Sequence, residues 1–269
     1  PMLSQPLAGR TIVITRAKSQ AEEFVAELER FGADVLICPT IEIHELENYE
    51  RLDEAIEHLY GYDWLIFTSV NGVDHFFKRL TASERNASDL DELKVCAIGE
   101  ATAGRLRDLH VHVDVIPEEF KAEGVFSSLE RFVGGYEKLK NLNVLIPRAS
   151  VARDYLPQAL EEAGARVDVV PAYRTALPES LDRGRVAAML SGQADCIAFT
   201  SSSTVRNLGR LFDTLDLSKA LGSVVVACIG DITAATAGDY GLTVKIQPEQ
   251  STIPALAQAI AEYFSSNNK

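Results

Sequence analysis

The segment "TIVITRAKSQAEEFVAELERFGADVLICPTIEI" at residues 11–43 has a second version, "NVLIPRASVARDYLPQALEEAGARVDVVPAYRT", at residues 143–175. Each version contains a short strand-forming run, a helix with apolar residues three and four apart, a glycine and a second strand-forming run. Arg16 matches Arg148, Gly32 matches Gly164 and Pro39 matches Pro171, in a repeat of about 132 residues.

Three further blocks repeat in the same order. The pairs are "DWLIFTSVNG" (63–72) with "ADCIAFTSSSTVRN" (194–207), "VCAIGEATAGRL" (95–106) with "VACIGDITAATA" (226–237), and "VDVIPEEFKAEGV" (113–125) with "VKIQPEQSTIPAL" (244–256). Matched blocks in a constant order indicate an internal duplication.

Strands and helices alternate within each repeat. In the first repeat the pattern predicts a helix over 17–32 and a strand over 34–39, then strands over 62–69, 94–99 and 113–117, with helices over 70–80 and 100–109 between them. Surface helices are expected within 46–60 and 178–191. Strands separated by helices of this length predict an α/β fold: two similar layered domains with parallel sheets, covered by helices on both faces.

The composition is that of a globular protein. The chain has 269 residues, 46% hydrophobic and 24% charged, and no apolar run reaches the roughly 18 residues that span a bilayer. The first ten residues show no apolar signal-peptide core, so we expect a cytoplasmic protein. A net charge of −13 argues against a nucleic-acid surface, although a local group of donors can still bind a small anion.

Cysteine and histidine residues suggest no metal site. The four cysteines (residues 38, 96, 196 and 228) form no CxxC pair and lie in apolar runs, so we expect buried free thiols in a reducing compartment. His110 and His112 would point the same way on a strand, but no Cys or carboxylate cluster completes a site, and a surface strand end is favoured.

Polar turns follow the predicted strands. They are "TRA" (15–17), "FTSVNG" (67–72), "IGEATA" (98–103), "IPRAS" (146–150), "FTSSST" (199–204) and "IGDITA" (229–234). Such residues can be helix N-caps, but the same edge of an open α/β sheet also binds ligands, and its free N–H groups suit carboxylates or phosphates. Since the common nucleotide, hydrolase and metalloprotease motifs are absent, the residues alone predict a two-domain protein that closes on a small anion.

The ordered motifs "GRTIVITRA", "FTSVNGV", "AIGEATA", "VIPEEFKAEG", "VPAYRT", "FTSSSTV" and "CIGDITA" resemble those of the uroporphyrinogen-III synthase family over nearly the whole chain. The resemblance implies a discontinuous domain 1 of residues 1–39 plus 175–269 and a domain 2 of residues 43–171. Residues 40–43 and 171–175 would form a two-stranded linker, so that each domain combines the first strand and helix of one repeat with the remainder of the other.

The resemblance also implies a reaction. The family's substrate is hydroxymethylbilane, a linear tetrapyrrole with eight carboxylates, which loses water and closes through a spiro intermediate to uroporphyrinogen III with ring D inverted. No metal or organic cofactor, nucleic acid or membrane partner is implied, and we expect a monomer. Catalysis would consist mostly of positioning, with acid assistance.

The resemblance also assigns candidate site residues, each by its position in a matching motif. Tyr173 corresponds to a family tyrosine that could protonate the departing hydroxyl; the alternative is a tyrosine packed at the linker. The remaining candidates are expected to contact substrate: Arg16, Thr68, Ser69, Thr102, Arg148, Ser201 and Thr233. Each of the hydroxyls could also serve as a helix cap, and the arginines could form surface ion pairs.

A non-enzymatic function is also compatible with these residues. A non-catalytic, two-lobed binding or sensory module for an anionic metabolite would have the same charge and the same polar turns. It would bind its ligand without turnover and would not need Tyr173.

Overall fold

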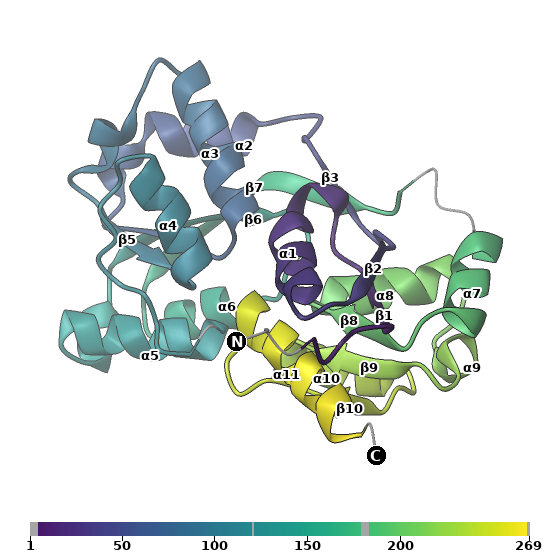
Figure 1. Cartoon of the computed structure of the whole chain (residues 1–269). Coiled ribbons are helices and arrows are strands. Elements are labelled where there is room, and N and C mark those ends of the chain that lie inside the picture. Colours follow the sequence, from purple (N-terminus) through teal and green to yellow (C-terminus); the bar gives the residue numbers. More distant parts are fainter. Residues whose placement is uncertain (1–4, 120, 179–182, 268–269) are drawn as a thin grey trace. The chain divides into compact units, whose positions relative to one another are not determined.

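A computed structural model describes residues 5–119, 121–178 and 183–267 of the chain. The chain divides into two compact units (Figure 1). Unit 1 comprises Pro1–Glu42 and Ala176–Lys269, and unit 2 comprises Ile43–Thr175. The chain therefore passes from one unit to the other twice.

Unit 1 is built on a five-stranded parallel sheet in the order β10-β9-β8-β1-β2. The strands are β1 (Thr11–Ile14), β2 (Asp34–Ile37), β8 (Cys196–Phe199), β9 (Val225–Cys228) and β10 (Val244–Ile246). Ile12 is in register with Val35 on one side and with Cys196 on the other. A strand from the first repeat thus lies between its own neighbour β2 and a strand from the second repeat.

Helices cover both faces of this sheet. They are α1 (Glu22–Arg30), α7 (Arg183–Gly192), α8 (Ser202–Leu211), α9 (Ser218–Leu221), α10 (Asp231–Asp239) and α11 (Ile253–Ser266). Because side chains alternate along a strand, Ile12 and Ile14 pack against α1 and α11, whereas Val13 packs on the other face with Val205 and Leu208 of α8. The first helix is shorter than predicted, since a 3₁₀ turn at Lys18–Gln20 precedes it.

Unit 2 repeats this plan with a sheet in the order β3-β7-β6-β4-β5. Its strands are β3 (Glu42–His44), β4 (Trp64–Phe67), β5 (Lys94–Ala97), β6 (Asn143–Ala149) and β7 (Arg166–Ala176). The α-helices are α2 (Glu50–Glu57), α3 (Val70–Ala82), α4 (Glu100–Asp108), α5 (Ala122–Val133) and α6 (Tyr155–Glu162). The first group, α2 to α4, packs on the sheet face of Leu65 and Phe67, and α5 and α6 pack on the face of Trp64 and Ile66.

The two sheets show how the repeats are combined. In unit 2, β6 of the second repeat lies between its own neighbour β7 and β4 of the first repeat, which mirrors the place of β1 between β2 and β8. Beside β7, unit 2 adds β3, the segment by which the chain enters this unit.

The prediction of a strand over residues 113–117 is wrong. This segment forms only an isolated bridge between Val115 and Cys96, whereas its counterpart in the second repeat is the true strand β10. The Asp114 carboxylate accepts a hydrogen bond from the Val95 amide at 2.8 Å, in the place where a neighbouring strand would offer a backbone carbonyl. A side chain therefore replaces a ladder bond, and the strand does not extend.

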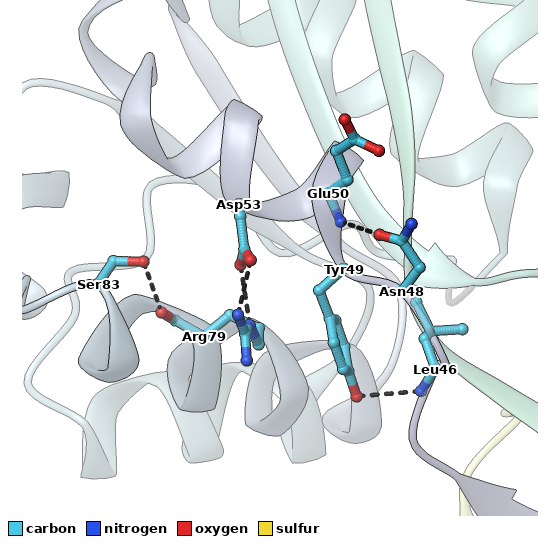
Figure 2. A network of polar contacts seen from close by, with 7 residues as sticks. All are labelled: Leu46, Asn48, Tyr49, Glu50, Asp53, Arg79 and Ser83. Carbon is cyan, nitrogen blue, oxygen red and sulfur yellow. Dashed lines mark hydrogen bonds and ion pairs between the residues drawn. The ribbon is translucent and has the colours of Figure 1, made fainter.

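A polar network fastens the segment after β3 to the helices of unit 2 (Figure 2). Arg79 of α3 donates two hydrogen bonds to Asp53 of α2, at 2.8 and 2.6 Å, and lies 4.6 Å from the centre of the Tyr49 ring. The Tyr49 hydroxyl accepts a hydrogen bond from the Leu46 amide at 3.1 Å. The helix expected within 46–60 is accordingly shorter, because residues 46–49 belong to this network.

Two general expectations can be compared with the described residues. All four cysteines are buried and free, as expected, and burial raises the pKa of the Cys38 thiol to about 11. Among the helices of the described residues, none combines the length and apolar character needed to cross a bilayer. Of the second predicted surface helix (178–191), residues 179–182 lie outside the described part, Pro178 is not helical, and α7 begins at Arg183.

Candidate active site

The carboxyl edge of the unit 2 sheet carries two helix N-termini. Thr68 and Ser69 lie between β4 and α3, and Gly99 lies between β5 and α4. Phe67 and Ala97 are in register, so the two turns begin at the same level. The first N–H groups of a helix have no intrahelical acceptor and carry partial positive charge, and no side chain caps α4. This edge is therefore suited to anions.

Ser69 joins this edge to Tyr173 of β7. Its Oγ accepts a hydrogen bond from the Gly72 amide at 3.0 Å and lies 3.1 Å from the Tyr173 hydroxyl. Tyr173 is only 7% exposed. Burial raises the pKa of its phenol, and hydrogen bonds from Ser69 and Asn71 oppose part of that shift. The phenol therefore keeps its proton at neutral pH and remains available as a donor.

A residue outside the predicted set covers the face of this phenol. The ring of His75 in α3 stacks on the Tyr173 ring with centroids 5.3 Å apart and an interplanar angle of 23°. Burial lowers the pKa of His75, with Asp74 opposing the shift, so the imidazole is neutral at neutral pH. A lone histidine within a helix gave no signal of this role. His75 lies one helical turn after Asn71, so both side chains are on the same side of α3. That this side faces Tyr173 is known only from the placement of β7 beside α3.

Arg148, at the end of β6, is occupied within unit 2. Its Nη1 donates to the Arg153 carbonyl at 2.7 Å, and its Nη2 pairs with the Asp154 carboxylate. The side chain is 12% exposed, and its Nε has no hydrogen-bond partner among the described residues. In this arrangement Arg148 holds the turn that precedes α6.

The corresponding edge of unit 1 repeats the serine cap without the phenol. Ser201 caps α8 by accepting from the Thr204 amide at 3.3 Å, with backbone angles (φ −158°, ψ 157°) that match those of Ser69 (φ −158°, ψ 156°). The repeat places Ile41, which is buried, at the position of Tyr173. The two edges therefore share their backbone geometry and differ in their chemistry.

Arg16 is a cation at this second edge. It lies two residues beyond the last residue of β1, Ile14, and is half-buried. Within the described part of the chain its guanidinium has no hydrogen bond or ion pair, and the charge acting on it is that of Glu23. Burial lowers its pKa, although the group remains charged. Unlike Arg148, Arg16 is not used to hold a neighbouring turn and can meet a carboxylate.

Two of the three predicted threonines lie deeper than the serines. Thr102 in the first turn of α4 and Thr233 in the first turn of α10 are each 5% exposed. Their hydroxyls are largely covered, so at these turns the helix N-terminus is the more accessible group. The structure thus brings Ser69 and Tyr173 into contact and places Thr68 beside them in the chain; Arg16, Ser201 and Thr233 belong to the other unit.

Comparison with known proteins identifies the family. The model for uroporphyrinogen-III synthase HemD matches residues 22–258. The chain belongs to the uroporphyrinogen-III synthase family. It is 34% identical over 266 residues to the uroporphyrinogen-III synthase of Synechococcus elongatus, covering 97% of this chain and 98% of that protein. The relative from Chlorobaculum parvum is 30% identical, with 94% and 98% covered.

Solved structures of uroporphyrinogen-III synthases have the same fold. A mutant of the Thermus thermophilus protein superposes with a TM-score of 0.66 at 20% identity, covering 96% of this chain and all of that one. The protein from Helicobacter pylori gives a TM-score of 0.59 at 20% identity, with 94% and 99% covered. The predicted family and the predicted class of two parallel-sheet α/β domains are thereby confirmed, and the chain is a hydro-lyase of tetrapyrrole biosynthesis.

Proposed function

We propose that the chain converts hydroxymethylbilane into uroporphyrinogen III and water, with inversion of ring D. Departure of the hydroxyl leaves an azafulvene cation, which the substituted carbon of ring D attacks to give a spiro intermediate. That intermediate opens and closes again with ring D turned around, and loss of a proton from carbon restores the pyrrole. The protein must therefore assist one proton transfer and hold a flexible polyanion in one folded arrangement.

Tyr173 is the proposed acid, and its contact with Ser69 is the observation that carries the proposal. The phenol is held at 3.1 Å from a serine whose own position is fixed by the Gly72 amide. Because burial raises its pKa, the phenol is protonated at neutral pH and can donate to the departing hydroxyl. The proton lost from carbon at the end of the reaction returns the phenol to its starting state.

Each sheet edge, taken by itself, offers groups that suit carboxylates. In unit 2 the N-termini of α3 and α4 offer N–H groups. Thr68 lies just before α3, and Thr102 lies in the first turn of α4. Unit 1 offers Arg16 and the first turns of α8 and α10, which contain Ser201 and Thr233. Carboxylates are stabilised at such positions by about 0.3–1 kcal/mol each, so many modest contacts take the place of one strong site.

Product analysis tests the function. Freshly generated hydroxymethylbilane is incubated with the protein, without added metal or nucleotide, and the products are oxidised to porphyrins and separated. We expect mainly the type III isomer, whereas closure without enzyme gives type I. A type I profile equal to that of the protein-free control would overturn the proposal. Stoichiometric binding without turnover would instead indicate a binding module.

Replacement of Tyr173 tests the proposed acid. Tyr173→Phe keeps the ring and removes the proton donor, so we expect kcat to fall by about 10²-fold with little change in KM. Tyr263→Phe is a suitable control, because this half-buried tyrosine belongs to α11 and packs against a core cluster of unit 1. Wild-type turnover in Tyr173→Phe would leave Tyr173 with a packing role only.

A further inference from the structure

The N-terminal part of α3 and its cap residue Ser69 surround the Tyr173 side chain. The Ser69 hydroxyl lies 3.1 Å from the phenol oxygen, Asn71 acts with it to lower the phenol pKa, and His75 covers the ring face. Oxygen and ring plane are therefore held from the start of a single helix, while the tyrosine itself comes from β7. This arrangement restrains both the position and the rotation of the phenol.

A histidine at position 75 is unfavourable for the stability of the fold. The Nδ1 atom of His75 is buried and has no hydrogen-bond partner within the described residues. A buried polar atom without a partner destabilises a protein, and phenylalanine would fill much of the same space without that loss. The charges around the ring give no compensation through an ion pair, since the neighbouring Asp74 is paired with Arg105 of α4 at 2.6 Å. Stability alone does not account for this side chain.

The second repeat shows that the fold does not require the ring pair. Asn207 occupies the position of His75 and Ile41 that of Tyr173, yet Ser201 and Ser69 have the same backbone conformation. The strand, turn and helix thus form equally well with and without the stacked rings. The His75–Tyr173 pair is an addition of unit 2, made where the proposed acid lies.

We propose that His75 is a positioning residue for Tyr173. This inference rests on the proposed function of the phenol as proton donor. Stacking holds the ring in the plane in which its hydroxyl meets Ser69, so that the proton is presented in one direction. Small misplacements of a catalytic group can cost large factors in rate, so loss of the stack should lower kcat and leave substrate binding nearly unchanged.

Two substitutions separate the ring from the rest of the side chain. His75→Leu removes the stack, and we expect kcat to fall about 10-fold with KM within about two-fold of wild type. His75→Phe keeps an aromatic face and should restore most of the activity. Asn207→Leu changes the corresponding position of unit 1 and should leave kcat within about two-fold. Equal losses in His75→Leu and His75→Phe would contradict the positioning role.

A double-mutant cycle distinguishes positioning from general structural damage. In the Tyr173→Phe background no phenol remains to be positioned, so adding His75→Leu should change kcat by less than about two-fold. A further 10-fold loss in that background would overturn the proposal, because the effect of His75 would then be independent of the phenol.

A spectroscopic measurement is independent of turnover. With ¹³C-labelled tyrosine, the Tyr173 ring signal is assigned by its disappearance in Tyr173→Phe. We expect this signal to shift in His75→Leu, as the ring current of the imidazole is lost, and to stay near its wild-type position in Asn207→Leu. An unchanged signal in His75→Leu would overturn the inference even if the wild-type enzyme forms type III product. Failure of the wild-type enzyme to form that product would refute the proposed function instead.

Discussion

Ser69 and Ser201 show how one residue type takes on different work in two copies of a turn. Both accept a hydrogen bond from the third residue beyond them, and their backbone angles agree within one degree. Ser69 also contacts a tyrosine, which lies 104 residues away in the sequence, and within the described residues Ser201 has no such contact. The sequence predicts both turns because capping is local. It cannot predict the tyrosine contact, which depends on the placement of β7 beside α3.

The serine pair gives the first residue-scale prediction. Ser69→Ala and Ser201→Ala should each lower the free energy of unfolding by about 1 kcal/mol, since each loses a helix cap. Ser69→Ala also loses the bond to Tyr173, so its kcat should fall by a further factor of roughly 2–12, while activity remains measurable. Urea denaturation and steady-state kinetics check both parts. Equal kcat values in the two variants would show that the contact with Tyr173 does not matter.

The titration of His75 should make the stability of the protein depend on pH. Because burial holds the pKa of His75 below its unfolded value, the unfolded chain takes up this proton first as pH falls. The wild-type protein should therefore lose stability as pH drops below about 6.5, the ordinary histidine pKa. His75→Phe lacks this group, so its stability should fall less between pH 7 and 5. Parallel slopes in urea denaturation at both pH values would contradict the assigned direction.

At the scale of elements, the two repeated arginines have separated in role. Arg16 lies just beyond β1 and Arg148 at the end of the equivalent strand β6, and the sequence predicts the same carboxylate contact for both. In the structure Arg148 binds the Arg153 carbonyl and Asp154, because the second repeat places these residues in the turn before α6. The sequence shows that a cation lies at each strand end, but the fold of the following turn decides whether that cation is free.

A pair of substitutions tests this division. Arg148→Ala should lower the free energy of unfolding by about 2 kcal/mol, because charge-assisted hydrogen bonds and the order of the turn are lost. Arg16→Ala should leave stability nearly unchanged and raise KM roughly 5–10-fold, an effect that weakens at high salt. Thermal melts and kinetics at two salt concentrations measure these effects. The opposite pattern, with Arg16 stabilising and Arg148 binding, would reverse the assignment.

At the scale of the whole molecule, each unit has its own cores on both faces of its sheet. The clusters around Ile12 and Val13 use only residues of unit 1, and those around Leu65 and Trp64 only residues of unit 2. The residue pattern predicts two parallel-sheet domains, but this pattern is the same whether each repeat folds on itself or exchanges its first two strands and the helix between them. Only the family resemblance predicts the exchange, because strand pairing between distant segments leaves no local signal in the sequence.

The sheet order leads to a prediction about autonomous folding. A fragment of residues 42–176 contains all five strands of the unit 2 sheet, including β6 between β4 and β7. We expect it to fold alone and to unfold cooperatively in urea, because both of its cores are complete. A fragment of residues 1–142 is of similar length and contains the whole first repeat, yet it lacks β6 and β7. Its β4 would lose an inner neighbour, and β1 and β2 would lack β8, so this control should show no cooperative transition by circular dichroism. A folded 1–142 fragment beside an unfolded 42–176 fragment would mean that each repeat is its own folding unit, in contradiction to the strand order.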